Sequence, residues 1–266
     1  RRQRQMCIRD RVPAAYALYV RYTLPESVRF LESQGRHEEA EEVVASFEAE
    51  VDDADIDRST PAPTYSEEDI TATSIWSKSL RERTLALWTI WFCVNLSYYG
   101  AFIWIPSLLV ADGFSLVKSF SFTLIITVAQ LPGYAAAAWL IEVWGRRSTL
   151  ATFLVGSALS AGLYGFASTE ATIILAGCLL SFFNLGAWGA LYAIGPELYP
   201  TALRGRGTGA AAGFGRLASI LAPLIVPPLI ATAGAGWLFV LFAVAFAIAA
   251  LAALSLPEFK GKTLAQ

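Results

Sequence analysis

Residues 171–204 read ATIILAGCLLSFFNLGAWGALYAIGPELYPTALR. The first part, 171–194, is apolar throughout and has the length of about 20 residues that a helix needs to cross the hydrocarbon core of a bilayer. The remainder is a short cluster with a glutamate, two prolines and an arginine. This stretch therefore predicts one membrane-spanning helix followed by a short polar loop.

The same alternation repeats along the chain. Hydrophobic residues make up 55% of the 266 residues and charged residues 16%, whereas about 25% of a soluble domain is charged. Backbone groups in lipid need partners within their own helix, and the runs lack the two-residue alternation of a membrane barrel. We expect an all-α membrane protein with six spans, at 85–110, 119–141, 148–167, 171–194, 207–232 and 237–256.

Basic residues predict the orientation of these spans, because lysine and arginine concentrate in cytoplasmic loops. One side of the bundle holds only Lys118. The other side holds Arg81, Arg83, Arg146, Arg147, Arg204, Arg206, Lys260 and Lys262. We expect this second side, and both ends of the six-helix block, to be cytoplasmic in a multi-pass protein of the plasma (inner) membrane.

The region before the spans differs in composition. Its first residues, RRQRQMCIRDR, show no pattern and are interpreted as a non-native leader, and the next apolar run is too short to cross a bilayer. Two short polar helices are expected at 25–50, broken at Gly35. The predicted organisation is a leader at 1–11, a remnant of a transmembrane helix at 12–20, a cytoplasmic helical loop and linker at 21–84, the six-helix domain at 85–256 and a cytoplasmic tail at 257–266.

Several chemistries have no support in the sequence. The single histidine, His37, has no cluster of ligating residues around it, and the cysteines do not show metal-ligand spacing. No HExxH, GxSxG or paired intramembrane acids occur. We therefore expect no catalytic residues, metal, cofactor or nucleic-acid partner, and we do not expect an enzyme.

Four polar clusters together carry a family resemblance. They are PESVRFL at 25–31, GRR at 145–147, PELYPTALR at 196–204 and PEFKG at 257–261. In this order they resemble the cytoplasmic elements of sugar-porter-type members of the major facilitator superfamily, from the end of helix 6 through helix 12. The resemblance implies the C-terminal bundle of that fold, a 3+3 inverted repeat, and a missing N-terminal transmembrane half. It also implies transport of a small organic substrate by alternating access.

Acidic and basic residues lie near the expected cytoplasmic helix ends. Such pairs could form a latch that holds two helix bundles together and separates when the site opens inward. The alternative is that the basic residues only set the topology. The candidate gate residues are Glu26, Arg29, Glu142, Arg146, Arg147, Glu197 and Arg204.

Other segments indicate the branch of the family. The seventh helix of the family corresponds here to WFCVNLSYYG at 91–100, which lacks the paired glutamines of sugar porters. The ELYPT form and an arginine within 207–232 are more similar to organic-ion transporters and to bacterial niacin or aromatic-acid transporters. The segments FSLVKSF at 114–120 and LPGYAAAAW at 131–139 resemble the niacin group as well.

Arg216 is the strongest candidate for binding a solute. It lies about 15 Å into its span, where an arginine costs at least about 2.5–3.5 kcal/mol to insert. No other expected span has an acidic residue at its middle. Arg216 is therefore expected to face a water-filled cavity and to bind a carboxylate with its guanidinium fork. Two alternatives stay open: backbone carbonyls near Pro223, Pro227 and Pro228, or a carboxylate from the missing half.

Further polar and aromatic residues fall at similar depths on other spans. The family resemblance places their helices around one central cavity, where an aromatic substrate could stack on rings and hydrogen-bond to amides. Ordinary helix packing is the alternative for the aromatic residues. These candidate substrate-binding residues are Asn95, Tyr98, Tyr99, Gln130, Asn184, Trp188 and Tyr192.

The expected function is transport of a small organic anion, with an aromatic monocarboxylate such as nicotinate favoured. A proton-linked sugar transporter of the same fold is the first alternative, and a non-transporting membrane fragment or scaffold is the second. A possible coupling proton would need a carboxylate outside these spans. The four-residue repeat of Gly205, Gly209 and Gly213 further predicts a face that packs closely against another helix.

Overall fold

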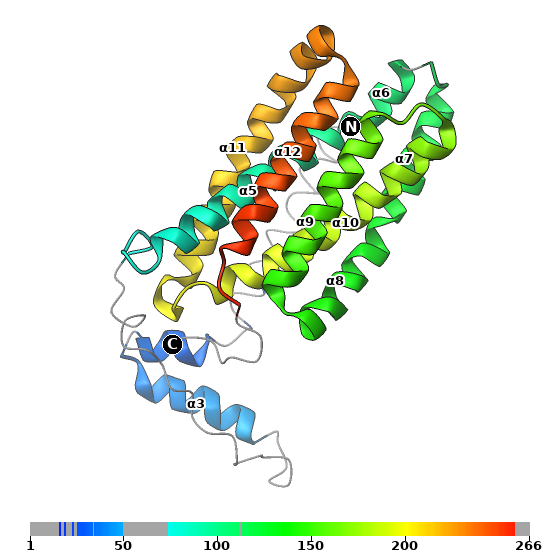
Figure 1. Cartoon of the computed structure of the whole chain (residues 1–266). Helices are drawn as coiled ribbons and strands as arrows, with labels where there is room; N and C mark the ends of the chain where they lie inside the picture. Colours follow the sequence, from blue (N-terminus) through cyan, green and yellow to red (C-terminus); the bar gives the residue numbers. More distant parts are fainter. Residues whose placement is uncertain are drawn as a thin grey trace, which may run out of the picture. The chain divides into compact units, whose positions relative to one another are not determined.

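The computed structural model describes residues 16, 19, 23, 26–33, 35–49, 74–111 and 113–258. All regular secondary structure in these ranges is helical (Figure 1). The chain divides into two compact units, 1–63 and 64–266, which are described separately. The predicted leader at 1–11 lies outside the described residues, as do most of the predicted remnant at 12–20, much of the linker and nearly all of the tail.

The first unit contains two short helices joined by a tight turn. Helix α2 covers Val28–Ser33 and α3 covers His37–Glu48, and Leu31 and Ala40 are buried where the two pack. Gly35 in the turn has a φ of 73°, a conformation that favours glycine. The predicted pair of helices with a break at Gly35 is therefore confirmed.

An ion pair also links the turn of this unit to the start of α3. Arg36 Nε donates a hydrogen bond of 2.8 Å to Oε1 of Glu39 in the first turn of α3. This hydrogen bond lowers the pKa of the Glu39 carboxyl, and so favours the negative charge at the helix N-terminus.

The span expected at 85–110 consists of two helices, α5 (Arg81–Ala101) and α6 (Ile105–Ala111), with a bend of 41° between them. Pro106 explains the break. Its ring would clash with the carbonyl one turn earlier, and it lacks the N–H that a continuous helix would use. The apolar pattern could not show this bend, because residues 102–104 are as apolar as the helices beside them.

The next two expected spans also begin earlier than predicted. Helices α7 (Leu116–Val128) and α8 (Gln130–Trp144) form one 29-residue stretch that is long and apolar enough to cross a membrane. Helix α9 (Arg146–Gly165) begins directly after Gly145, whose φ is 93°. The polar GRR segment is thus a tight corner between two helices.

The last three helices are longer or shifted relative to the expected spans. They are α10 (Glu170–Glu197), α11 (Thr201–Ala233) and α12 (Ala235–Leu254). Pro196 lies in the last turn of α10, so the polar loop expected at 196–206 shrinks to three residues, 198–200. Helix α11 continues through its three prolines, Pro223, Pro227 and Pro228, without a break.

Four of the described helical stretches are long and apolar enough to cross a membrane, or five if α5 and α6 count as one bent span. The remaining helix, α9, occupies the third expected position, 148–167, and is not apolar enough to count as a span. Its 20 residues include serine, threonine and glycine among the apolar positions. The structure therefore has a helix at each of the six expected positions, and four or five of them qualify as spans by length and composition.

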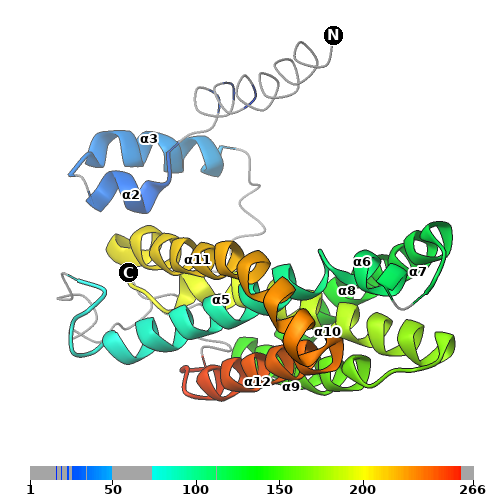
Figure 2. The ribbon, with the colours of Figure 1, turned by 90° about the horizontal axis from the view of Figure 1, so that it is seen from above.

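Large aromatic side chains fill the core of the second unit. Helix α9 packs between α10 and α12, and α5 packs against α11 and α12 (Figure 2). Phe153, Phe239, Phe242 and Phe246 are fully buried there. A side chain at Gly186 on α10 would overlap the ring of Phe153, so this glycine is what allows the two helices to approach.

The glycine repeat predicted to pack closely does not do so within the described part of the chain. A Cβ added at Gly205, Gly209 or Gly213 would meet nothing within 4 Å. The close approach on α11 occurs instead at Gly215, opposite α5. A four-residue spacing identifies one face of a helix, but it does not determine which neighbour that face meets.

Candidate functional site

The candidate arginine lies near the centre of α11 and contacts α5. Nη1 of Arg216 donates a hydrogen bond of 2.8 Å to the hydroxyl of Tyr99. The arginine side chain is exposed within the unit, and Tyr99 is half-buried. Because a guanidinium has five N–H donors, this single bond leaves most of its donors available to a solute.

A series of aromatic rings connects this pair to α10. Tyr99 makes an edge contact with Tyr98 at 5.3 Å between ring centroids, and Tyr98 makes another with Trp188 at 6.0 Å. Trp188 in turn stacks on Tyr192 at 5.6 Å. The structure therefore brings five of the predicted site residues, from three helices, into one connected group.

Asn95 lies beside this group but faces the helix interface. Its side chain is fully buried. Nδ2 donates to the backbone oxygen of Trp91 at 2.7 Å, and Oδ1 accepts a hydrogen bond of 3.1 Å from Ser219. Both polar ends of the amide therefore have partners within the protein.

The two remaining amides have no recorded contact with the arginine group. Gln130 is the half-buried first residue of α8. Asn184 is fully buried in α10, and neither its nitrogen nor its oxygen has a hydrogen-bond partner among the described residues. Buried amides usually have such partners, so Asn184 is a polar group that the protein's own side chains leave unsatisfied.

Sequence reasoning missed two residues of this region. Trp91 makes edge contacts with Trp188 at 5.4 Å and with Tyr192 at 5.2 Å. Because it precedes Asn95 by one helical turn, helical spacing would have placed it on the same face. Ser219 gives no comparable signal, since a serine inside an apolar helix most often bonds to its own backbone.

Several predicted gate residues meet at the opposite end of the helices from the Lys118–Glu170 ion pair. Nε of Arg146 donates to Oε1 of Glu197 at 3.0 Å, and Nη2 of Arg146 lies 3.6 Å from Oε1 of Glu142. The ends of α8, α9 and α10 are thereby joined. This arrangement matches the sequence-based grouping of these charges at one end.

The other predicted gate residues have different surroundings. Arg147 Nη1 donates to the backbone oxygen of Leu256 at 3.3 Å, and Arg204 Nε donates to that of Pro196 at 2.9 Å. Both bonds tie one helix end to a neighbouring segment. Glu26 is exposed in the separate first unit, and the side chain of Arg29 lies outside the described residues.

Glu258 was not among the predicted gate residues. Its two carboxylate oxygens accept hydrogen bonds of 3.2 Å from the backbone N–H groups of Arg146 and Arg147, at the N-terminus of α9. The φ of 93° at Gly145 explains the glycine in GRR, since other residues rarely adopt that conformation. The PEFKG motif contained this signal, because an acid suits a helix N-terminus.

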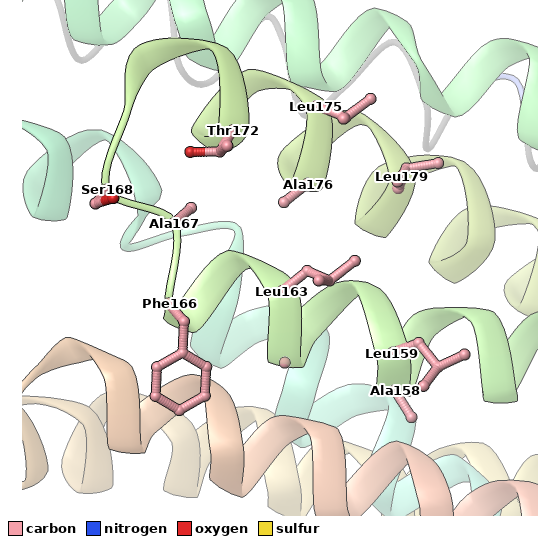
Figure 3. A pocket seen from close by; sticks show the side chains of 11 residues that line it. Ala158, Leu159, Leu163, Phe166, Ala167, Ser168, Thr172, Leu175, Ala176 and Leu179 are labelled. Carbon is pink, nitrogen blue, oxygen red and sulfur yellow. The ribbon is translucent and has the colours of Figure 1, made fainter.

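A large apolar groove lies elsewhere. It has a volume of about 700 Å³ between the end of α9 and the start of α10, and its lining is almost wholly apolar (Figure 3). None of the arginine and aromatic residues above lines it. A solute site needs a few convergent polar groups, so we place the candidate site at Arg216 and not in this groove. No cluster of potential metal ligands occurs among the described residues.

Several helices of this length and apolarity indicate a multi-pass membrane protein. A family model described as "Sugar (and other) transporter" matches residues 4–266. The chain therefore belongs to this family of transporters, which are not enzymes, and it is a multi-pass integral membrane protein.

The fold is that of the major facilitator superfamily. The chain superposes with a TM-score of 0.65 on the proton:xylose symporter XylE bound to 6-bromo-6-deoxy-D-glucose. The match covers 95% of this chain and 56% of that chain, at 22% sequence identity. At this identity the likeness concerns the fold alone.

Two bacterial relatives are considerably more similar in sequence. The niacin transporter NiaP of Acinetobacter baylyi is 43% identical over 255 residues, which are 95% of this chain and 58% of the relative. The putative niacin/nicotinamide transporter NiaP of Bacillus subtilis is 42% identical over 218 residues, or 82% of this chain and 48% of the relative. The resemblance to niacin transporters read from the motifs is confirmed. The chain spans about half the length of these relatives.

Proposed function

We propose that this chain is the C-terminal bundle of a transporter that moves a small organic anion, with an aromatic monocarboxylate such as nicotinate favoured. The observation that carries the proposal is the Arg216–Tyr99 pair beside a group of aromatic rings. Sequence identity above 40% to two NiaP proteins points to the same chemistry. The arginine supplies the charge that an anion needs, and the rings supply the surface that a flat heteroaromatic ring needs.

The chemistry follows from the depth of Arg216 within its expected span. In a membrane protein the field of a guanidinium is poorly screened, so its attraction for a carboxylate is stronger than in water. Tyr99 occupies one donor, and two of the remaining N–H groups can form a bidentate pair with the carboxylate. The pyridine ring would stack against Tyr98 or Trp188, with Tyr192 beside it and with Gln130 and Asn184 as candidate amide partners. Both ends of the buried Asn95 amide already have partners within the protein.

The transport cycle in this proposal needs a second bundle. Alternating access rocks one bundle against another around a central site. We propose that the six helices form a 3+3 repeat, that an N-terminal bundle supplies the other wall, and that the end carrying Arg146 and Glu197 is cytoplasmic in the plasma membrane. The 266-residue chain expressed by itself is then expected not to accumulate substrate. A proton is a possible coupling partner, with its carboxylate on the N-terminal bundle.

The cytoplasmic latch is part of the same proposal. Arg146 and Glu197 are joined at 3.0 Å, and both side chains are largely shielded from solvent. A pair of this kind could exchange partners with charges on the other bundle. The pair would then hold the outward-facing state closed on the inside.

The test measures uptake of matched solutes by the two-bundle protein, that is, this chain together with the proposed N-terminal bundle. Nicotinate, neutral nicotinamide and glucose are offered to cells that express the wild type, Arg216→Lys or Arg216→Ala. We expect nicotinate uptake in the wild type, a partial loss with lysine, which keeps the charge but not the fork, and a loss of 100-fold or more (~3 kcal/mol) with alanine. Glucose uptake without nicotinate uptake would favour the proton-linked sugar transporter instead. Nicotinate uptake that is unchanged in Arg216→Ala would contradict the anion site.

A further inference from the structure

The helices that carry Tyr99 and Arg216 approach each other closely at Gly215. A Cβ at this position would lie 2.8 Å from Nδ2 of Asn95 and 3.1 Å from the backbone oxygen of Trp91. The contact with the Trp91 oxygen would be tighter than nine in ten real Cβ contacts, and backbone cannot move aside as the end of a side chain can. Helix α11 is therefore in backbone contact with α5 directly before Arg216.

Two hydrogen bonds set the register of α11 along α5, which the close contact alone does not determine. Asn95 Nδ2 donates to the Trp91 oxygen at 2.7 Å, which orients the amide so that Oδ1 faces α11. Ser219 Oγ donates to that oxygen at 3.1 Å. Asn95 is 0% exposed, so this inter-helix bond is shielded from competing water.

The spacing ties these bonds to the arginine. Asn95 and Tyr99 lie one turn apart on α5, and Gly215 and Ser219 lie one turn apart on α11, with Arg216 between them. A slip of one residue along α11 would move it by about 1.5 Å and rotate it by about 100°. That slip would turn Ser219 away from Asn95 and Arg216 away from Tyr99 together.

We propose that Asn95 and Ser219 are positioning residues, which lock the register of α11 against α5 so that Arg216 is held toward the solute. In this assignment Asn95 acts through Arg216 and does not contact the solute. The effect on solute affinity rests on the proposed function, whereas the register itself does not.

Threonine and valine have nearly the same shape, but only threonine has a hydroxyl. Replacing Ser219 by each of them therefore separates the effect of the hydroxyl from the effect of added bulk. In the two-bundle protein, we expect Ser219→Thr to stay within about twofold of wild type. We expect Ser219→Val to raise the nicotinate KM by about five- to tenfold, the effect of one lost hydrogen bond, with kcat changed by less than about twofold. Ser219→Ala, which cannot overfill the interface, should behave like valine.

A second measurement reads the register without a substrate. Cysteines replace Tyr99 and Arg216 in a protein whose native cysteines are changed to serine, and a bifunctional methanethiosulfonate reagent bridges them in membranes. We expect bridging in the Ser219→Val background to be at least about threefold slower than in the Ser219→Thr background. Both backgrounds must elute as monodisperse protein, and Ser219→Ala replaces valine if that variant does not.

The outcomes separate the two proposals. Slower bridging together with a raised KM supports the positioning role. Slower bridging, when the wild-type two-bundle protein does not take up nicotinate, supports the register lock and rejects the proposed substrate. Equal bridging rates in the two backgrounds overturn the positioning role, even if the KM changes, because Ser219 would then act on the solute directly.

Discussion

Nη1 of Arg216 lies 2.8 Å from the hydroxyl of Tyr99, and this bond joins the middle of α11 to the C-terminal end of α5. The arginine has no carboxylate partner among the described residues, so the phenol is the neutral group that orients it. A neutral partner leaves the positive charge uncompensated. In the proposed function, an incoming anion therefore meets a guanidinium that is already aimed but not neutralised.

Tyr99→Phe tests this orienting role. The ring and its contact with Tyr98 remain, while the acceptor for Arg216 is lost. We expect the nicotinate KM to rise about three- to tenfold, because Arg216 must then be ordered by the solute itself. Steady-state uptake measures this change. Tyr192→Phe is the matched control, since Tyr192 is exposed and its hydroxyl has no recorded bond. An equal rise in both variants would mean that any lost phenol has this effect.

Gly186→Ala tests the aromatic core between α9 and α10. The new methyl group would overlap the buried ring of Phe153, so we expect a loss of about 1–3 kcal/mol and a lower melting temperature in detergent. Gly162→Ala is the control on α9, where an added Cβ meets nothing within 4 Å. That variant should melt within about a degree of the wild type or slightly above it. Similar losses in the two variants would argue against the packing explanation.

Glu258→Gln tests the acid that caps α9. The amide keeps the size of the side chain but removes the negative charge facing the N-terminus of the helix. We expect a loss of about 1 kcal/mol in stability, read as a lower melting temperature. Glu82→Gln removes a charge of the same sign from the exposed first turn of α5 and should cost less. If the Glu82 variant is affected as strongly, the loss reflects net charge and not capping.

Glu197→Gln tests the proposed latch. Arg146 would keep its weaker contact with Glu142 at 3.6 Å but lose its charged partner at 3.0 Å. We expect the population of inward-facing molecules to increase about two- to tenfold, because a part-buried charge pair is worth more than an exposed one. Reactivity of single cysteines placed on the two faces of the two-bundle protein reports this balance. An unchanged balance would leave Arg146 as a topology signal only.

The sequence predicted the helical positions better than it predicted where helices bend. Apolar runs identified a helix at each expected position, because the need to satisfy backbone groups in lipid acts locally on every residue. The break between α5 and α6 was missed even though Pro106 was visible, since a proline inside an apolar run can end a helix or only kink it. The three prolines in α11 show the opposite result, because the helix continues through them.

The candidate site was predicted in part. Arg216 and the aromatic residues were identified by depth and by helical spacing, and the structure joins them through recorded contacts. Asn95 was identified as well, but its partners Trp91 and Ser219 show that it faces α11. Periodicity gives the face of a residue on its own helix, and it does not give the rotation of the neighbouring helix.

The sequence by itself determined the membrane class, the family and the rare charge, since each depends on composition or on short motifs that need no knowledge of distant contacts. Only the tertiary structure decided which glycine brings α11 against α5, which acid caps α9 and which group orients Arg216. Gly215 and not the Gly205–Gly209–Gly213 repeat makes the close contact. These contacts depend on the register and rotation of whole helices. Register and rotation result from the packing of many side chains together, so no single segment of the sequence determines them.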